Sequence, residues 1–524
     1  MSARRRPSEG SASALTRFAL VGVSLAALLV PVASLLGPEL GALRNWQYAL
    51  APLFLAAIVR AGLTGEAPGV PTALRNFLFF ALAVWMLAGE ALNFWAMLVN
   101  GVDYSIFDWM LESTLRGRFM WSPIYGVNHF GVHQMWPLVA LVPVHAVLRF
   151  PFGLCLVNVA LLVSAAVVLW HLARRLAGDD LTAVLAVLAF GTNPWVGRLL
   201  TNGFRDESFF PIAVFLFVSA WLEKRPLLVA GATLLVCSIK EDAPFYVLGF
   251  ALAAAFRRGH SRAGAAGVAL IAAATLALDL WVVRPAALKA TGGGEPGYLS
   301  LWGGYGSSLG AILLSVLTSP GRALRDVITS GWPRLLGPSL LLPLLSPECV
   351  GAMLPGFVML GLSGFPPMRA FVGYHPVPLV CVALCGMLVA GRAYKAHRGM
   401  TTLVRVALLL FPLVGGGYFR VVWPSAEQRE GLSQLRAALG RSTAPLCAQT
   451  ILYPQLGYPA DLRPLETACQ ELPGSISVLN TRLDPWPHTR GELEQLLSVA
   501  RREGRSSEFI GGFALIRPPS PAGS

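Results

Sequence analysis

Apolar runs long enough to cross a bilayer recur along most of this sequence, with short polar junctions between them. A helix rises about 1.5 Å per residue, so about 20 consecutive apolar residues span the hydrocarbon core. Only 13% of the 524 residues are charged, about half the share of a typical water-soluble domain. Too few residues are charged to form a water-exposed surface over so long a chain. We therefore expect lipid to cover much of the protein surface. The sequence therefore predicts an integral membrane protein that crosses the bilayer many times.

The apolar runs predict an all-α polytopic bundle with about 13 spans. Several runs are shorter than a full crossing, which is tolerated inside a bundle where neighbouring helices cover the ends. The segment 136–149 is apolar but short and interrupted by prolines, so we expect it to be re-entrant or interfacial. The predicted spans are 17–36, 47–62, 76–99, 152–173, 181–199, 209–222, 226–239, 243–257, 263–283, 334–347, 350–364, 376–391 and 402–420.

Lys and Arg are concentrated at particular junctions, and this distribution predicts the orientation. With a cytoplasmic N-terminus, the span count places these junctions on the cytoplasmic side, as the positive-inside rule requires. They also account for the net charge of +13, so we do not expect nucleic acid as a partner. We expect a multi-pass protein of the plasma or inner membrane with an extracytoplasmic C-terminal domain. The basic junctions are 174–175, 223–225, 257–262 and 392–398.

The predicted spans divide the chain into three regions. Residues 1–75 form a basic N-terminal tail and an added transmembrane hairpin, and residues 76–420 form the transmembrane core. Two long segments of this core, 100–135 and 284–333, fall on the outer side. Residues 421–524 are more polar and form the soluble C-terminal domain.

The C-terminal domain is predicted to be a small α/β fold. Residues 491–503 place apolar side chains on one helical face, and 509–516 is an apolar, strand-like run. Short apolar runs at 445–452 and 476–479 are further candidate strands. Cys447 and Cys469 lie in the same region. Outside the cytoplasm they could form a disulfide, and the alternative is a pair of free thiols.

Three carboxylates gather in the first outer segment, at Asp103, Asp108 and Glu112. Asp108 and Glu112 are four residues apart, so on a helix they share a face. Like charges at that spacing raise one pKa, which suits a general base or half of a Mg²⁺ or Mn²⁺ site. Asp103 and Asp108 are the candidate catalytic residues and candidate metal ligands, and Asp103 is preferred because it follows the preceding span most closely. The alternative is an ordinary solvated loop with an N-cap aspartate.

Further charged groups lie at outer junctions, where they either anchor helices at the interface or line a substrate pathway. The tight acid–base runs 205–207 and 240–242 share the outer face with Asp103. Arg369 has the geometry to bind a phosphate oxygen, whereas an isolated His near a span is more often structural. The candidate substrate-binding residues are Glu112, His133, Arg205, Glu207, Lys240, Glu241, Arg369 and His375.

Several of these motifs occur in an order that resembles a family of bacterial and archaeal membrane proteins, domain of unknown function 2079 (DUF2079). The resemblance covers roughly residues 85–420 and part of the tail. At 206–207 this sequence has Asp-Glu where the family often has His-Pro-Glu, so no histidine role transfers there. The matching motifs are the runs 102–108 and 117–119, His133 with Pro137, the Lys-Glu-Asp run 240–242, the Leu-Pro-Leu-Leu run 342–345 and the Tyr-His-Pro run 374–376.

The layout of that family is similar to the GT-C glycosyltransferase superfamily. The resemblance implies transfer of a sugar from a polyprenyl-phosphate carrier to an acceptor on the outer face, with the lipid-linked donor and membrane lipid as partners. In most GT-C enzymes the acidic loop follows the first span, whereas here it follows the third, which makes 17–62 an added hairpin.

Two other kinds of function use the same features. A transporter or lipid flippase would use the junctional charges as a pathway, although it predicts charges near mid-membrane and broken helices in repeated halves. A non-catalytic scaffold would bind a partner through its tail. The sequence has no P-loop, zinc-protease helix, paired CxxC or nucleophile elbow, which argues against ATP hydrolysis and structural zinc. It predicts no oligomeric state.

Overall fold

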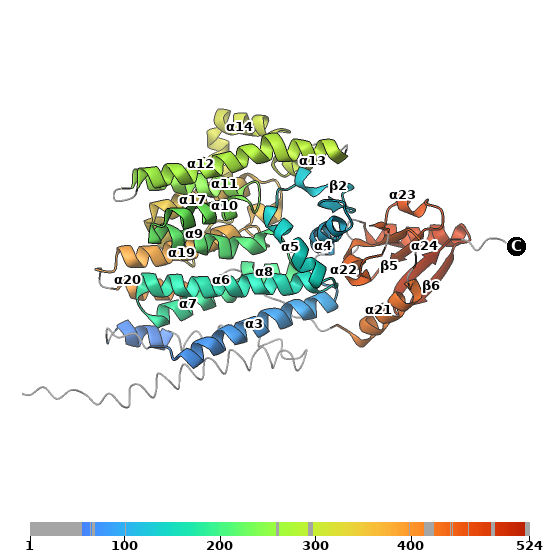
Figure 1. The fold of residues 1–524 in the computed structure, drawn as a ribbon, viewed down its shortest axis with the longest axis horizontal. Coiled ribbons are helices and arrows are strands. Elements are labelled where there is room, and N and C mark those ends of the chain that lie inside the picture. The colour runs from blue at the N-terminus through green and yellow to red at the C-terminus, as the bar shows by residue number, and fades with distance from the viewer. Residues whose placement is uncertain are drawn as a thin grey trace, which may run out of the picture.

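A computed structural model gives the architecture of the chain. It describes residues 55–62, 64, 69–99, 101–257, 261–291, 297–397, 399–412, 424–440, 442, 444–459, 461–483 and 488–518. The predicted span 17–36 lies outside these residues, and the predicted spans 47–62 and 402–420 are described only in part. Figure 1 shows a bundle of roughly aligned helices with a smaller unit containing a sheet at one end.

Within the described residues, three helices have the length and apolar composition to cross a membrane, namely Thr72–Trp95, Gly153–Ala177 and Arg262–Ala290. They correspond to α3 (Thr72–Trp95), α6 (Gly153–Ala177) and the continuous helix of α12 (Arg262–Leu278), η4 (Asp279–Val283) and α13 (Arg284–Thr291). A fourth crossing is available if α7 (Asp180–Gly191) and α8 (Pro194–Asn202) form one span bent by 45°. The bend follows from Asn193, which caps α8, and from Pro194, which begins it.

Shorter apolar helices complete the bundle around α6 (Figure 1). They match further predicted spans, although the total of about 13 stays a prediction. Gly249 and Gly351 let two of them approach closely, since a Cβ on Gly249 would lie 2.0 Å from the Gly351 carbonyl oxygen. These helices are α9 (Phe210–Glu223), α10 (Pro226–Cys237), α11 (Ala243–Phe256), α17 (Pro347–Leu362), α19 (Val377–Ala393) and α20 (Met400–Leu410).

The predicted span 334–347 is wrong. The chain there forms only the single turns α16 (Pro333–Leu336) and η6 (Leu342–Leu345). Pro338 and Pro343 each remove a backbone N–H and clash with the preceding turn, so the apolar run cannot continue as a helix.

The two long segments predicted to lie outside, 100–135 and 284–333, are largely structured where they are described. The first contains α4 (Gly101–Leu115), the short hairpin of β1 (Trp121–Ser122) and β2 (Val127–Asn128), and η2 (His129–Gly131). It leads into α5 (Trp136–Val147), a helix of 12 residues with Pro143 inside it. In the second, η5 (Gly297–Trp302) precedes α14 (Leu309–Thr318) and α15 (Pro320–Ile328), and α14 is an apolar helix that the sequence analysis did not predict.

The C-terminal unit contains, among the described residues, a five-stranded sheet in the order β4-β3-β5-β7-β6. Pairing of β3 with β4 and β5 is parallel, whereas β7 is antiparallel to β5 and β6. The elements are α21 (Ala426–Leu439), β3 (Leu446–Ala448), η7 (Thr450–Leu452), α22 (Tyr453–Leu456), β4 (Leu462–Pro464), α23 (Thr467–Gln470), β5 (Ile476–Leu479), α24 (Arg490–Arg502), β6 (Ser506–Ile510) and β7 (Phe513–Arg517).

Two details of this unit refine the sequence analysis. The predicted strand at 509–516 is two strands, because Gly511 and Gly512 adopt positive φ and turn the chain between β6 and β7. A disulfide joins Cys447 of β3 to Cys469 of α23, with the Cα atoms 5.9 Å apart. This bond ties the start of the sheet to the helix packed beside it.

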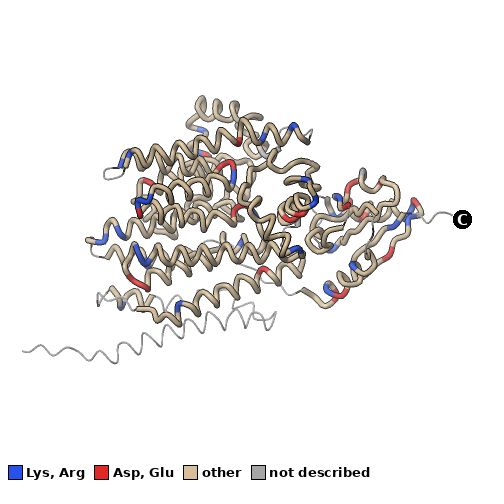
Figure 2. Tube along the Cα trace, viewed as in Figure 1, with Lys and Arg blue, Asp and Glu red and all other residues tan. Residues whose placement is uncertain are grey.

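Charged residues are unevenly distributed between the helical bundle and the C-terminal unit. Figure 2 shows long charge-free stretches along α6 and α12, with charges gathered toward helix ends and in the C-terminal unit. In α6 the basic residues are Arg174 and Arg175 in the last turn. A buried carboxyl also occurs within a bundle helix, since Glu90 of α3 accepts hydrogen bonds of 3.0 and 3.1 Å from Asn158 of α6.

Candidate functional site

Helix α4 places the acidic side chains of the first outer segment on two different faces. Asp103 and Asp108 are five residues apart, which on a helix of 3.6 residues per turn separates their directions by about 140°. Asp108 and Glu112 are separated by only about 40°, and both contact His145 of α5. The two candidate catalytic aspartates therefore belong to two separate groups.

Asp103 meets charged residues from the other junctions that are predicted to be outer. It forms an ion pair with Arg205, which lies between α8 and η3 (Asp206–Phe209). Lys240, between α10 and α11, has its Nζ 2.9 Å from Asp206 Oδ2 and 2.9 Å from Glu207 Oε1. We call Asp103, Arg205, Asp206, Glu207 and Lys240 the junction cluster. Three segments distant in sequence therefore bring opposite charges to one place.

Arg205 is the most buried cation of the junction cluster. Its side chain is 3% exposed, and its Nε lies 3.7 Å from Glu207 Oε2. Within the described part of the chain, nothing accepts a hydrogen bond from Arg205 Nε or Nη1. Buried N–H groups of a guanidinium are normally satisfied, so these two donors have the capacity to bind an anion.

Tyr374 lies against the guanidinium of Arg205, with the guanidinium carbon 3.1 Å from the ring centroid. The ring of His375 is 4.2 Å from that of Tyr374. Burial lowers the pKa of His375 to about 3, with Lys240 and Arg205 acting in the same direction. The sequence analysis selected His375 and overlooked Tyr374, although an aromatic residue beside an outer histidine was the available signal.

Glu241 and His133 form a pair beside the junction cluster. Glu241 Oε1 lies 2.7 Å from His133 Nδ1. Burial opposes ionisation of Glu241, but the charge of His133 outweighs it and holds the Glu241 pKa at about 2. Burial likewise opposes protonation of His133, and Glu241 outweighs it, so the His133 pKa is raised. The pair is therefore stabilised in its charged form.

The carboxylates of the junction cluster have opposite tendencies. Burial and the neighbouring Asp206 raise the pKa of Glu207 to about 8. Burial also acts on Asp206, but the charge of Lys240 prevails and lowers its pKa. The cluster thus holds a charged carboxylate and a readily protonated one around the same ammonium group.

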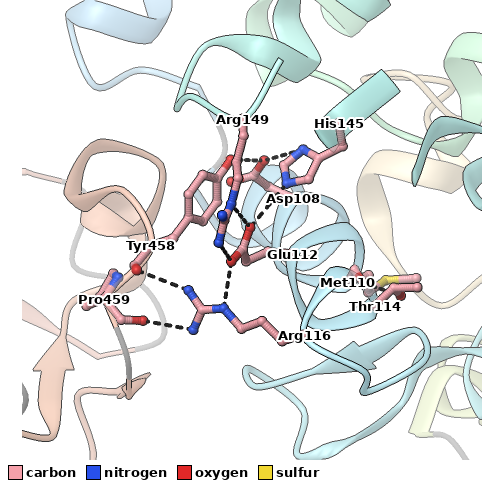
Figure 3. Close-up of polar contacts among 9 residues, drawn as sticks. All are labelled: Asp108, Met110, Glu112, Thr114, Arg116, His145, Arg149, Tyr458 and Pro459. Carbon is pink, nitrogen blue, oxygen red and sulfur yellow. Dashed lines mark hydrogen bonds and ion pairs between the residues drawn. The ribbon is translucent and has the colours of Figure 1, made fainter. Parts of the chain in front are cut away.

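Asp108 and Glu112 face the C-terminal unit (Figure 3). The Tyr458 hydroxyl donates to Asp108 Oδ1 at 2.9 Å. Arg149 donates to both oxygens of Glu112, at 2.5 and 2.9 Å, and Arg116 donates to Oε1 at 2.6 Å. The carboxylate of Glu112 is fully buried and engaged by protein groups on each oxygen.

The pKa values of Asp108 and Glu112 differ because Glu112 has more cationic partners. Burial raises the pKa of Asp108 to about 7, against the smaller opposing effects of His145 and Tyr458. Burial acts on Glu112 as well, but the nearby His145 and the hydrogen bonds from Arg149 and Arg116 prevail and bring its pKa to about 2. Cation contacts thus decide which carboxyl stays ionised.

Arg369 lies elsewhere. Its Nη2 is 3.2 Å from Asp326 Oδ1 and 3.3 Å from Thr329 Oγ1, both of the second outer segment. Asp326 also accepts a hydrogen bond of 2.6 Å from Tyr305. The structure therefore does not place Arg369 in the junction cluster.

The residues do not suggest a metal centre. Among the described residues, no group of three or more His, Cys, Asp or Glu side chains is arranged to hold an ion. Asp103 and Asp108, the candidate ligands for Mg²⁺ or Mn²⁺, point to different groups of partners. No step at this site is therefore assigned to a metal.

A family model described as predicted membrane protein (DUF2079) matches residues 93–506, which include α4, both groups of charged residues and most of the C-terminal unit. The chain belongs to the DUF2079 family of membrane proteins. A comparison with curated proteins finds no match. Among solved structures, the chain is similar to ArnT from Cupriavidus metallidurans bound to undecaprenyl phosphate. The identity is 10%, the TM-score is 0.45, and the match covers 85% of this chain and 98% of that one. At these values the likeness assigns neither substrate nor site residues to this DUF2079 protein.

Proposed function

We propose that this membrane protein is a GT-C-type glycosyltransferase that passes a sugar from a polyprenyl-phosphate carrier to an acceptor hydroxyl at the outer face. The observation that carries the proposal is the junction cluster, in which the Asp103 carboxylate lies beside the buried guanidinium of Arg205. The reaction needs a base for the acceptor and positive charge for the leaving phosphate. The cluster supplies both.

In the proposed reaction, the acceptor oxygen attacks the anomeric carbon of the donor sugar. The new C–O bond forms as the bond between the sugar and the phosphate oxygen breaks, and the polyprenyl phosphate leaves with the electron pair. The hydroxyl proton goes to Asp103. Arg205 and Lys240 stabilise the charge that develops on the phosphate. Because the phosphate competes with Asp103 for Arg205, donor binding makes the carboxylate a better base.

The remaining residues near the cluster have supporting roles in this proposal. Glu207 and Asp206 fix the Lys240 ammonium group, and Tyr374 supports the plane of Arg205. His133 and Glu241 form a charged pair next to Lys240 and would contact the sugar or the acceptor. Placement of this site at the outer face follows from the predicted orientation.

The proposal is tested with the full-length protein in proteoliposomes that contain a polyprenyl-phosphate-linked sugar and a soluble acceptor. We expect a new glycosidic product, and loss of that product in the Lys240→Gln variant. Movement of the intact lipid across the bilayer without a product would support a transporter or flippase instead. Absence of both activities with a panel of lipid-linked sugars, combined with retained binding of a protein partner, would favour the scaffold.

A further inference from the structure

The polar contacts between α4 and the C-terminal unit have no part in the proposed reaction, yet they involve two buried carboxylates of α4. Asp108 and Glu112 are 3% and 0% exposed. Tyr458 of the C-terminal unit contacts Asp108 directly. Glu112 is connected to the same stretch through Arg116, which also donates to the Tyr458 and Pro459 carbonyls, more than 340 residues away in sequence. A polar network at such depth requires that its members meet with good geometry.

Hydrogen bonds of two side chains, Tyr458 and Arg116, join the C-terminal unit to this face of α4 (Figure 3). The Tyr458 hydroxyl donates to Asp108 Oδ1 at 2.9 Å. Arg116 follows α4, donates to Glu112, and also donates to the carbonyl oxygens of Tyr458 at 3.1 Å and Pro459 at 3.2 Å. We call Asp108, Glu112, Arg116 and Tyr458 the α4 clamp.

Apolar contacts extend the same interface. The rings of Trp109 and Tyr458 are 5.9 Å apart, edge to face. Trp109 and Met97 belong to the core formed by Leu452, Tyr453 and the sheet of the C-terminal unit. Gln455 donates to the backbone carbonyl of Phe94 at 2.8 Å, at the end of α3. The C-terminal unit therefore contacts both the helix that enters the first outer segment and the helix within it.

The geometry of α4 connects this interface to the junction cluster. α4 is a continuous helix of 15 residues, and Asp103 in its first turn is on the opposite side from the clamp. Since a helix moves as a rigid unit, rotation about its axis would displace Asp103 and Asp108 together. Tyr104, Met110 and Leu111 are fully buried, so apolar packing resists sliding, while the clamp fixes the rotation.

We propose that the α4 clamp makes the C-terminal unit part of the catalytic machinery, with Tyr458 and Arg116 as positioning residues that hold Asp103 against Arg205. This inference rests on the proposed function for its kinetic consequence. Its structural consequence, a helix held in place by the C-terminal unit, is measurable without any substrate.

The first measurement is hydrogen–deuterium exchange of α4 in the full-length protein. Tyr458→Phe removes one hydroxyl and keeps the ring against Trp109, and Arg116→Gln removes the bridge to the Tyr458 and Pro459 carbonyls. In the double variant we expect the α4 amides to exchange at least about tenfold faster, with each single variant between it and the parent. Arg482→Gln, in an exposed ion pair with Glu427 of the same unit, is the matched control and leaves α4 unchanged.

The second measurement is transfer kinetics on the same variants. We expect kcat to fall roughly 10- to 100-fold in the double variant with little change in KM for the lipid donor, because Asp103 is misplaced while Arg205 and Lys240 stay in position. Asp108→Asn keeps an acceptor for Tyr458 and should preserve slow α4 exchange, whereas Asp108→Leu should not.

Two results would overturn the inference. Unchanged α4 exchange in the double variant would show that the clamp does not hold the helix. Faster exchange with full kcat would show that the position of α4 has no effect on catalysis. If the parent protein transfers no sugar at all, the proposed function fails, and the exchange measurement still decides whether the clamp exists.

Discussion

The junction cluster and the α4 clamp are two groups of charges attached to one helix, and they differ in how accessible the carboxylates of α4 itself are. The side chain of Asp103 is 27% exposed and that of Lys240 is 19% exposed. In the clamp, the side chains of Asp108 and Glu112 are 4% and 0% exposed. A reacting group must reach a substrate, whereas a structural ion pair must exclude water to gain strength. The comparison therefore supports the proposal that one face of α4 carries the chemistry and the other attaches the helix to the C-terminal unit.

The largest expected effect concerns Glu112 of the clamp, which accepts hydrogen bonds from Arg116 and from Arg149 outside the clamp. Replacing both Arg116 and Arg149 by Gln leaves the Glu112 carboxylate buried, with His145 as its remaining titratable partner. We expect the free energy of unfolding to fall by about 3–5 kcal/mol, as for other buried charges that lose their partners. Denaturation of the purified protein in detergent measures this. A loss below about 1 kcal/mol would mean that the clamp resembles a surface ion pair, and the distinction between the two faces would weaken.

Arg205→Gln tests the accessible face. This change removes the charge beside the leaving phosphate, so kcat for sugar transfer should fall roughly 10²- to 10³-fold, a loss of about 3–4 kcal/mol of transition-state stabilisation. Arg369→Gln is the control, since Arg369 pairs with Asp326 outside the cluster, and it should cost far less. Equal losses in the two variants would argue that the outer arginines act only through general stability.

Removing the disulfide tests whether the stability of the C-terminal unit affects the α4 clamp. Replacing Cys447 and Cys469 by Ser removes a cross-link that closes a 22-residue separation, and should destabilise the C-terminal unit by about 3 kcal/mol. Faster exchange should then appear both in the sheet and in α4. Faster exchange in the sheet with α4 unaffected would separate the helix from the C-terminal unit.

A further expected effect is a pH dependence at Asp108. Its folded-state pKa is raised from 3.8 to about 7. Stability therefore declines as pH rises from about 4 to about 7, because the unfolded carboxyl ionises in this window while the buried one keeps its proton. Asp108→Asn cannot ionise, so its stability relative to the parent should increase over this window. Glu112, with a pKa of about 2, does not titrate there. A constant difference between the two proteins would refute the raised pKa.

The sequence predicted the C-terminal α/β unit, most helices of the bundle and the shared helical face of Asp108 and Glu112, because these features depend on local periodicity. The separation of Asp103 from Asp108 was also present in their five-residue spacing. The sequence did not reveal the partner of Asp108, since Tyr458 lies 350 residues further on and only the tertiary fold brings the two residues together. The false span at 334–347 arose because an apolar count took no account of Pro338 and Pro343.

Glu90 is a second feature whose surroundings the sequence did not predict. It lies within the predicted span 76–99 and was counted as part of an apolar run. In the structure its carboxyl is buried against Asn158, five residues before α3 ends at Trp95. One charge among many apolar residues does not alter a span prediction, and its partner on α6 depends on how the helices pack.

The division between the two faces of α4 is tested most directly by comparing Asp103→Asn and Asp108→Asn in one sugar-transfer assay. We expect kcat to fall about 10²- to 10⁴-fold in Asp103→Asn, as for loss of a general base. In Asp108→Asn it should fall less than about tenfold, because Asn still accepts the Tyr458 hydrogen bond. The reverse order, with Asp108→Asn inactive and Asp103→Asn active, would contradict the assignment of chemistry to the junction cluster.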